Sequence, residues 1–126
     1  MTDAGAPDLS GRRVLVVEDE YLTADEICSA LAASGAHVIG PAPSLAQAQQ
    51  LLGVEHIDCA VLDVNLRGDP VFPFADQLRG NSVPIVFATG YDPSAIAERH
   101  GACDHLLKPL DLAALLSAVA QACSRP

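Results

Sequence analysis

The stretch Val14-Leu15-Val16-Val17-Glu18-Asp19-Glu20 decides the fold of this 126-residue chain. Four aliphatic residues in a row, without polar alternation, are typical of a strand that is buried on both faces in a parallel sheet. Acidic residues follow Val17 directly, so the strand ends there. The stretch therefore predicts an α/β sheet that carries carboxylates at the carboxyl end of one strand.

Similar short apolar runs recur along the chain and alternate with helical patterns. We expect further strands over 37–39, 59–62, 83–88 and 103–107, and a loop over 65–70. Helices are expected over 21–33, from the N-cap Ser44 to Gly53, over 70–79, over 93–99, and from the cap Asp111 to about Ala122. Five strands alternating with helices predict a doubly wound fold, with one parallel sheet and helices on both faces.

The length of the chain fits one domain. Residues 1–11 are small and polar without periodicity, so we expect a flexible leader followed by one domain over 12–124. Because the sequence stops soon after the last expected helix, we expect no separate output domain.

The charge balance excludes several classes of partner. Sixteen acidic and seven basic residues give a formal net charge of -9, which repels nucleic acid and anionic lipid. No apolar run approaches the roughly 20 residues that a membrane span needs, and the N-terminus lacks the order of a signal peptide. We expect a cytoplasmic protein that binds neither nucleic acid nor membrane.

The cysteines do not form a recognisable metal motif. Each lies in an apolar segment, as expected of reduced core residues: Cys28, Cys59, Cys103 and Cys123. His100, Cys103 and His105 are close enough in sequence to suggest a metal clip. The alternation there favours a strand instead, and no fourth ligand is evident.

Residues that directly follow parallel strands meet at one edge of the sheet, where α/β proteins bind ligands. Here they are Glu18, Asp19, Asp63, Thr89 and Lys108. Carboxylates at about 4 Å from one another repel by about 4 kcal/mol per pair, so a cation must lie among them. Oxygen ligands without His or Cys favour Mg²⁺ over zinc.

Asp63 is the best placed nucleophile toward a phosphoryl donor, with Glu18 and Asp19 holding the metal on one side. The Thr89 hydroxyl and the Lys108 ammonium suit the phosphoryl oxygens. Singly these signals are weak, since an acidic pair also suits a helix N-terminus and Thr89 a turn. Their ordered appearance at strand ends carries the interpretation.

Four motifs in order give the chain a family resemblance: VLVVEDE (14–20), VLDVNL (61–66), FATG (87–90) and LLKPL (106–110). Over about residues 12–124 the sequence resembles the response-regulator receiver family of two-component signalling. The resemblance implies a flavodoxin-like sheet ordered 2-1-3-4-5 and Mg²⁺-dependent phosphorylation of Asp63 by a sensor histidine kinase. Residues 84–91, PIVFATGY, are similar to the FATGUY group of single-domain response regulators.

The resemblance also implies roles for individual residues. Asp19, Asp63 and the backbone carbonyl of Asn65 would ligate the metal directly, and Glu18 would reach it through water. The peptide bond between Lys108 and Pro109 would be cis.

One position departs from the family pattern. Most receivers carry an aromatic switch residue three positions before the lysine, where this chain has His105. Tyr91, two residues after Thr89, is the expected substitute, with a ring that moves when Thr89 moves.

These inferences predict a single-domain response regulator, a phosphoacceptor signalling domain that acts as an enzyme only in its own phosphorylation and slow autodephosphorylation. The expected partners are the histidine kinase and a downstream target or phosphotransfer protein, with the chain a monomer or a weak dimer. Relay, phosphate sink and direct target binding all stay open.

Two rival interpretations come from other classes. A phosphatase of the haloacid dehalogenase type also uses an aspartate after a strand with Mg²⁺, but it carries a second aspartate where this chain has Asn65. A degenerate receiver that only binds partners would not need Asp63, Thr89 and Lys108 together.

Overall fold

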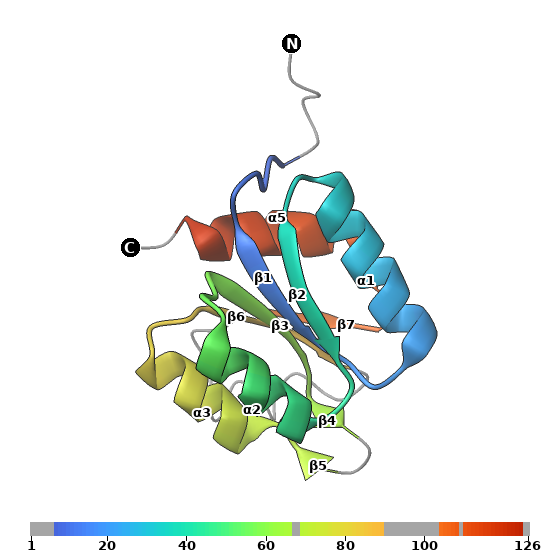
Figure 1. Ribbon diagram of the computed structural model, residues 1–126. Helices are drawn as coiled ribbons and strands as arrows, with labels where there is room; N and C mark the ends of the chain where they lie inside the picture. The colour runs from blue at the N-terminus through green and yellow to red at the C-terminus, as the bar shows by residue number, and fades with distance from the viewer. Residues whose placement is uncertain (1–6, 67–68, 90–103, 109, 125–126) are drawn as a thin grey trace.

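The computed structural model describes residues 7–66, 69–89, 104–108 and 110–124 (Figure 1). In chain order the elements are β1 (Arg13–Val17), α1 (Tyr21–Ala33), β2 (His37–Ala42), α2 (Leu45–Val54), β3 (Cys59–Asp63), β4 (Asn65–Leu66), β5 (Asp69–Pro70), α3 (Phe72–Gly80), β6 (Ile85–Thr89), β7 (Asp104–Leu107) and α5 (Leu112–Cys123). The helix expected over 93–99 lies outside the described residues.

The main sheet has five strands in the order β2-β1-β3-β6-β7, and each neighbouring pair is parallel. Because β4 and β5 form a separate small hairpin, this order is the predicted 2-1-3-4-5. The doubly wound α/β fold is therefore confirmed.

Two hydrophobic clusters fill the spaces between the sheet and its helices. Alternate residues of β1 divide between them, because successive side chains of a strand point to opposite faces. Leu15 and Val17 pack with α2 and α3, whereas Val14 and Val16 pack with α1 and α5. Figure 1 shows α2 and α3 on one face of the sheet, and α1 and α5 on the other.

The helix ends follow the predicted capping residues with one exception. Ser44 Oγ accepts a hydrogen bond from Gln47 N at 3.3 Å, and Asp111 Oδ1 accepts one from Ala113 N at 3.0 Å. Gly35 has a φ of +95°, which suits the turn after α1. Gly53, predicted to end α2, lies inside it, because the helical bonding continues to Glu55 N, which donates to Leu51 O at 2.9 Å.

The strand predicted over 37–39 continues to Ala42. Gly40 allows this extension, because its φ of +104° fits an irregularity in the pairing with β1 that few other residues tolerate. Beyond the irregularity, Val17 pairs with Ala42.

Residues 7–11, the described part of the predicted leader, contact the rest of the domain. Leu9 is buried in the cluster between the sheet, α1 and α5, and its N–H donates to Ser34 O at 2.8 Å. Arg12 N donates to Leu9 O at 3.0 Å. One leucine among polar residues gives no periodic signal, although its burial anchors the chain before β1.

The loop predicted over 65–70 contains the two-residue strands β4 and β5, which pair antiparallel. The short third helix is confirmed as α3, and Pro73 fits because it lies in the first turn, where no N–H is needed. Among the described residues no helix combines the length and apolar character that crossing a membrane requires.

Candidate functional site

The strand register brings the predicted residues to one edge of the sheet. Val17 pairs with Leu62, so Glu18 stands level with Asp63 at the carboxyl ends of β1 and β3. Asp63 pairs with Ala88 of β6, and Thr89 pairs with Leu107 of β7. Thr89 and Lys108 therefore follow at the same edge on the two adjacent strands.

Three carboxylates meet at this edge. Glu18, Asp19 and Asp63 each offer an oxygen, and these oxygens lie within 4.8 Å of one another. Glu18 is only 2% exposed and Asp63 8%, so much of their negative charge is removed from water. We call these three residues the acidic cup.

Lys108 places its ammonium group at the acidic cup. The Lys108 Nζ lies 2.9 Å from Glu18 Oε1 and 3.6 Å from Asp63 Oδ2. The structure thus brings together Glu18, Asp19, Asp63 and Lys108, as the sequence predicted.

The carboxyl group of Glu18 has a raised pKa. Burial is the largest cause that raises its pKa, to about 7, and the charge of Asp63 adds to it. The contact with Lys108 acts in the opposite direction without cancelling the rise. Close to neutral pH, burial therefore makes the charged form of Glu18 unfavourable, and a further cation beside it would stabilise that form.

The two oxygens of Glu18 are unequally satisfied. Oε2 accepts a hydrogen bond from Glu20 N at 3.1 Å. Oε1 is buried and, among the described residues, has only the ion pair with Lys108, without the geometry of a regular hydrogen bond. A buried carboxylate oxygen in this state is ready to accept a ligand.

Lys108 stays cationic in these surroundings. Burial of its ammonium acts to lower its pKa, but the close contact with Glu18 and the charges of Asp63, Glu18 and Glu20 outweigh it, and the pKa is raised. A fixed positive charge therefore stands beside Asp63 at neutral pH.

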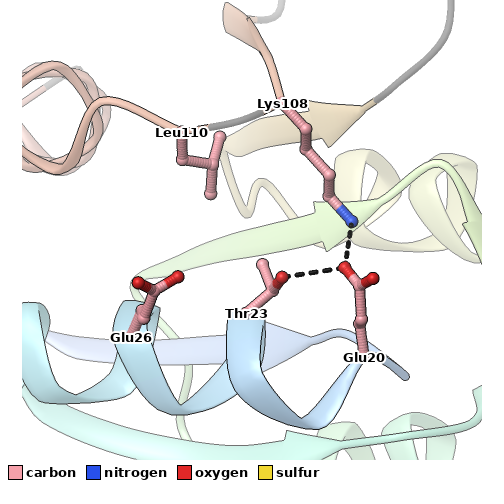
Figure 2. Close-up of a pocket in the computed structure, with 5 residues that line it drawn as sticks. All are labelled: Glu20, Thr23, Glu26, Lys108 and Leu110. Carbon is pink, nitrogen blue, oxygen red and sulfur yellow. Dashed lines mark hydrogen bonds and ion pairs between the residues drawn. The ribbon is translucent and has the colours of Figure 1, made fainter.

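An open hollow of about 490 Å³ adjoins Lys108 and is lined by Glu20, Thr23, Glu26, Lys108 and Leu110 (Figure 2). Thr23 Oγ1 donates to Glu20 Oε1 at 2.8 Å, and Glu20 Oε1 lies 3.8 Å from Lys108 Nζ. Sequence reasoning missed Glu20 as a contact of the lysine. Its position as the third acid after β1 was the available signal.

The donor set fits a hard divalent cation. Within the described part of the chain the cup consists of carboxylates alone, and one of its oxygens is buried without a regular hydrogen bond. Oxygen ligands of this kind suit Mg²⁺ or Ca²⁺. Glu18, Asp19 and Asp63 are the residues that could hold such an ion.

Several predicted site residues are only partly described. Thr89 ends β6 and His105 pairs with Phe87 inside β7, but their side chains are outside the described residues. Asn65, two residues after Asp63, is the first residue of β4. Tyr91 and Pro109 lie wholly outside the described residues, so the aromatic switch and the cis peptide bond stay predictions.

A parallel sheet covered by helices on both faces, with carboxylates and a lysine at its carboxyl edge, defines a doubly wound domain with an acidic edge. The family model of the response regulator receiver domain matches residues 14–120. The chain belongs to this family and is a receiver domain of a two-component response regulator.

Curated relatives share the domain. The chain is similar to the transcriptional regulatory protein PdtaR of Mycobacterium tuberculosis, with 30% identity over 127 residues. It is also similar to the sensory transduction protein LytT of Bacillus subtilis, with 37% identity over 103 residues. The matches cover 98% and 79% of this chain but span only 60% of PdtaR and 43% of LytT.

Solved structures share the fold. The receiver domain of the sensor histidine kinase PA1611 of Pseudomonas aeruginosa, with a magnesium ion coordinated in its active site cleft, matches with a TM-score of 0.78 and 22% identity over 92% of this chain and 100% of that chain. A Burkholderia pseudomallei response regulator with a phosphorylated aspartic acid and a calcium ion matches with a TM-score of 0.77 and 24% identity, over 86% and 66%.

Proposed function

We propose that this receiver domain accepts a phosphoryl group on Asp63 from a phosphorylated histidine kinase, in a reaction that depends on Mg²⁺. The observation that carries the proposal is the geometry of the acidic cup, whose oxygens lie within 4.8 Å of one another, with Lys108 Nζ 3.6 Å from Asp63 Oδ2. A phosphoacceptor needs a carboxylate nucleophile, a site for a cation and a fixed positive charge, and these residues provide all three.

Asp63 is the nucleophile in this proposal. It ends the fully buried strand β3, yet it is 8% exposed, so its carboxylate opens at the edge of the sheet. An oxygen of Asp63 bonds to phosphorus as the bond from phosphorus to the histidine nitrogen of the donor breaks.

Asp19 and Asp63 would hold the metal directly, Glu18 would reach it through water, and the backbone carbonyl of Asn65 is proposed as a further ligand. When bound, Mg²⁺ supplies charge neutralisation for the carboxylates and for the transferring phosphoryl oxygens. Glu18 gains most from this neutralisation, because its charge is the most deeply buried of the cup.

Lys108 and Thr89 are proposed to bind the new phosphoryl oxygens. The ammonium of Lys108 already lies beside Asp63, so a charge-assisted contact requires little movement. Thr89 stands at the end of the strand adjacent to β3. Its hydroxyl would donate to a second oxygen and would draw the end of β6 toward the modified aspartate.

The resulting change in shape is the proposed signal. Phosphorylation adds about one negative charge at Asp63, and a nearly complete switch between two states needs about 5.5 kcal/mol of differential stabilisation. Thr89, Tyr91 and His105 are the proposed switch residues. The partner of the modified form is a protein, since the net charge of -9 disfavours nucleic acid.

Labelling with a small phosphodonor tests this proposal without knowledge of the cognate kinase. Phosphoramidate with Mg²⁺ should label the protein at one residue, and Asp63→Asn should abolish the label. Asp25→Asn, which changes an exposed aspartate of α1, is the matched control and should be labelled as the parent protein is. Undiminished labelling of the Asp63→Asn protein would exclude Asp63 as the acceptor.

A further inference from the structure

Two cysteines meet at the opposite end of the sheet from the acidic cup. Cys59 is the first residue of β3 and is fully buried, and Cys123 is the last residue of α5 and is half-buried. Both belong to the hydrophobic cluster between the sheet, α1 and α5, where the two thiols lie close enough to interact. The Cys59 thiol also donates to Ala60 O at 3.9 Å. Two cysteines that are 64 positions apart in the sequence thus present adjacent sulfur atoms.

The surroundings of Cys123 favour its thiolate. The interaction with the Cys59 thiol is the largest influence on its pKa and lowers it, and the positive charge of Arg12 lowers it further. Burial and the charge of Asp58 act in the opposite direction, but the net shift is downward. A thiol with this character reacts with oxidants more readily than an ordinary cysteine.

Cys28 offers an internal comparison. It is also half-buried and packs on the same cluster, but burial, followed by the charge of Asp25, raises its pKa. The thiolate is therefore more favoured at Cys123 than at Cys28. Among the described residues, Cys123 lies against a second thiol and Cys28 does not.

We propose that Cys59 and Cys123 form a redox site that a hydroperoxide converts into a disulfide, which joins the start of β3 to the end of α5. The inference depends on the contact between the two thiols and is independent of phosphorylation at Asp63. The free thiols described here are its reduced state.

The chemistry balances with hydrogen peroxide as the oxidant. The Cys123 thiolate attacks one peroxide oxygen, the O–O bond breaks, and the leaving hydroxide takes a proton to become water, which leaves a sulfenic acid on Cys123. The Cys59 sulfur then attacks the Cys123 sulfur, and the S–O bond breaks with release of a second water. Two thiols are oxidised to one disulfide and the peroxide is reduced to water.

The pairing is best tested in a Cys28→Ser, Cys103→Ser chain, which keeps only the proposed pair. Trypsin could not separate Cys28 from Cys59 in the parent chain, because no Lys or Arg lies between them. Treatment with peroxide at low protein concentration, followed by N-ethylmaleimide, should give a monomer about 2 Da lighter that takes up no maleimide. Dithiothreitol should restore both thiols.

Cys59→Ala in the same background separates a redox pair from two packed core residues. Peroxide should then drive Cys123 to the sulfinic acid, and alkylation of Cys123 by iodoacetamide should slow, while circular dichroism reports an intact fold. In the parent protein, Cys123 should be alkylated several-fold faster than Cys28.

Three results would overturn the proposal. The first is overoxidation of Cys123 while Cys59 still accepts maleimide. The second is a disulfide that appears only in dimers. The third is oxidation of Cys28 in the parent protein at peroxide concentrations that leave Cys59 and Cys123 reduced.

Discussion

The two ends of the central sheet treat charge in opposite ways. At the amino end, Arg13 Nη2 lies 2.5 Å from Glu55 Oε1, Arg13 Nε donates to His56 O at 2.8 Å, and Arg13 N donates to Asp58 Oδ2 at 2.8 Å. At the carboxyl end, the three carboxylates of the acidic cup lie together, and Lys108 Nζ pairs with those of Glu18 and Asp63. Each of the two carboxylates named at the amino end has a hydrogen-bond donor of its own, whereas the three carboxylates of the cup stand against one ammonium group among the described residues.

Burial sharpens this difference. The side chains of Arg13 and Glu55 are 30% and 36% exposed, and such pairs contribute about 0–1 kcal/mol because water screens them. The side chain of Glu18 is only 1% exposed, so its charge interacts strongly with its neighbours. We infer that the amino end serves stability, whereas the carboxyl end gives up stability to keep a site ready for a cation and a phosphoryl group.

Removal of the lysine should have the largest effect on function. Lys108→Ala should slow labelling of Asp63 by phosphoramidate by about 10- to 100-fold, the equivalent of about 1.4–2.7 kcal/mol for a charge-assisted contact. The rate of label incorporation at saturating Mg²⁺ measures this loss. Arg13→Ala is the matched control at the amino end and should be labelled at the parent rate. Equal reductions of the labelling rate in both variants would contradict a specific role of Lys108 at the carboxyl end.

Stability should depend on pH through Glu18. Its pKa is raised from 4.5 to about 7 by folding, so the folded state binds the proton more tightly than the unfolded state. Without divalent cations, the free energy of unfolding should therefore fall as the pH rises from about 4.5 through 7, by on the order of 1–3 kcal/mol. Urea denaturation across this range in EDTA measures the fall.

Glu18→Gln removes the titrating group and should flatten this part of the pH profile. Glu55→Gln, at the amino end, should leave the slope unchanged. An unchanged slope in the Glu18→Gln protein would show that the pH dependence arises elsewhere.

A divalent cation should stabilise the folded protein by reducing the repulsion among the carboxylates of the acidic cup. Magnesium at ten times its dissociation constant should raise the free energy of unfolding by about 1.4 kcal/mol, because it binds only the folded state. Thermal unfolding with and without MgCl₂ measures the increase. Asp19→Asn should reduce it and Asp58→Asn should not; equal stabilisation of both variants would point to binding outside the cup.

The smallest effect is expected at the exposed pair of the amino end. Glu55→Gln should lower the free energy of unfolding by less than about 1 kcal/mol, and high salt should remove most of the difference. Urea denaturation at low and high ionic strength tests this. A loss of several kcal/mol would mean that the ion pair between Arg13 and Glu55 contributes more to stability than its exposure indicates.

Local pattern predicted much of this molecule because its strands are short, aliphatic and followed at once by chemically distinctive residues. Val14 to Val17 and the acids after them placed both β1 and two of the three residues of the acidic cup. Lys108 was placed by its position after β7, because parallel strands end at a common edge. Caps such as Ser44 and Asp111 fixed helix starts for an equally local reason.

The missed features depend on contacts between distant residues. Leu9 is buried because α1, α5 and the sheet leave a space for it, which its polar neighbours do not reveal. Glu20, just before α1, contacts Lys108, just after β7, although the two residues are far apart in the sequence. The hairpin of β4 and β5 closes a loop whose Gly, Asp and Pro predicted only irregular structure.

The most direct test of the central claim is an NMR titration of the ¹⁵N-labelled protein with Mg²⁺ and then beryllofluoride, a mimic of the phosphoryl group. The contrast between the two ends predicts large shifts for amides near Glu18, Asp63, Thr89 and Lys108, and almost none near Arg13 or Asp58. Saturable shifts confined to the carboxyl edge would support this contrast. Silence at that edge, or shifts as large at the amino end, would contradict it.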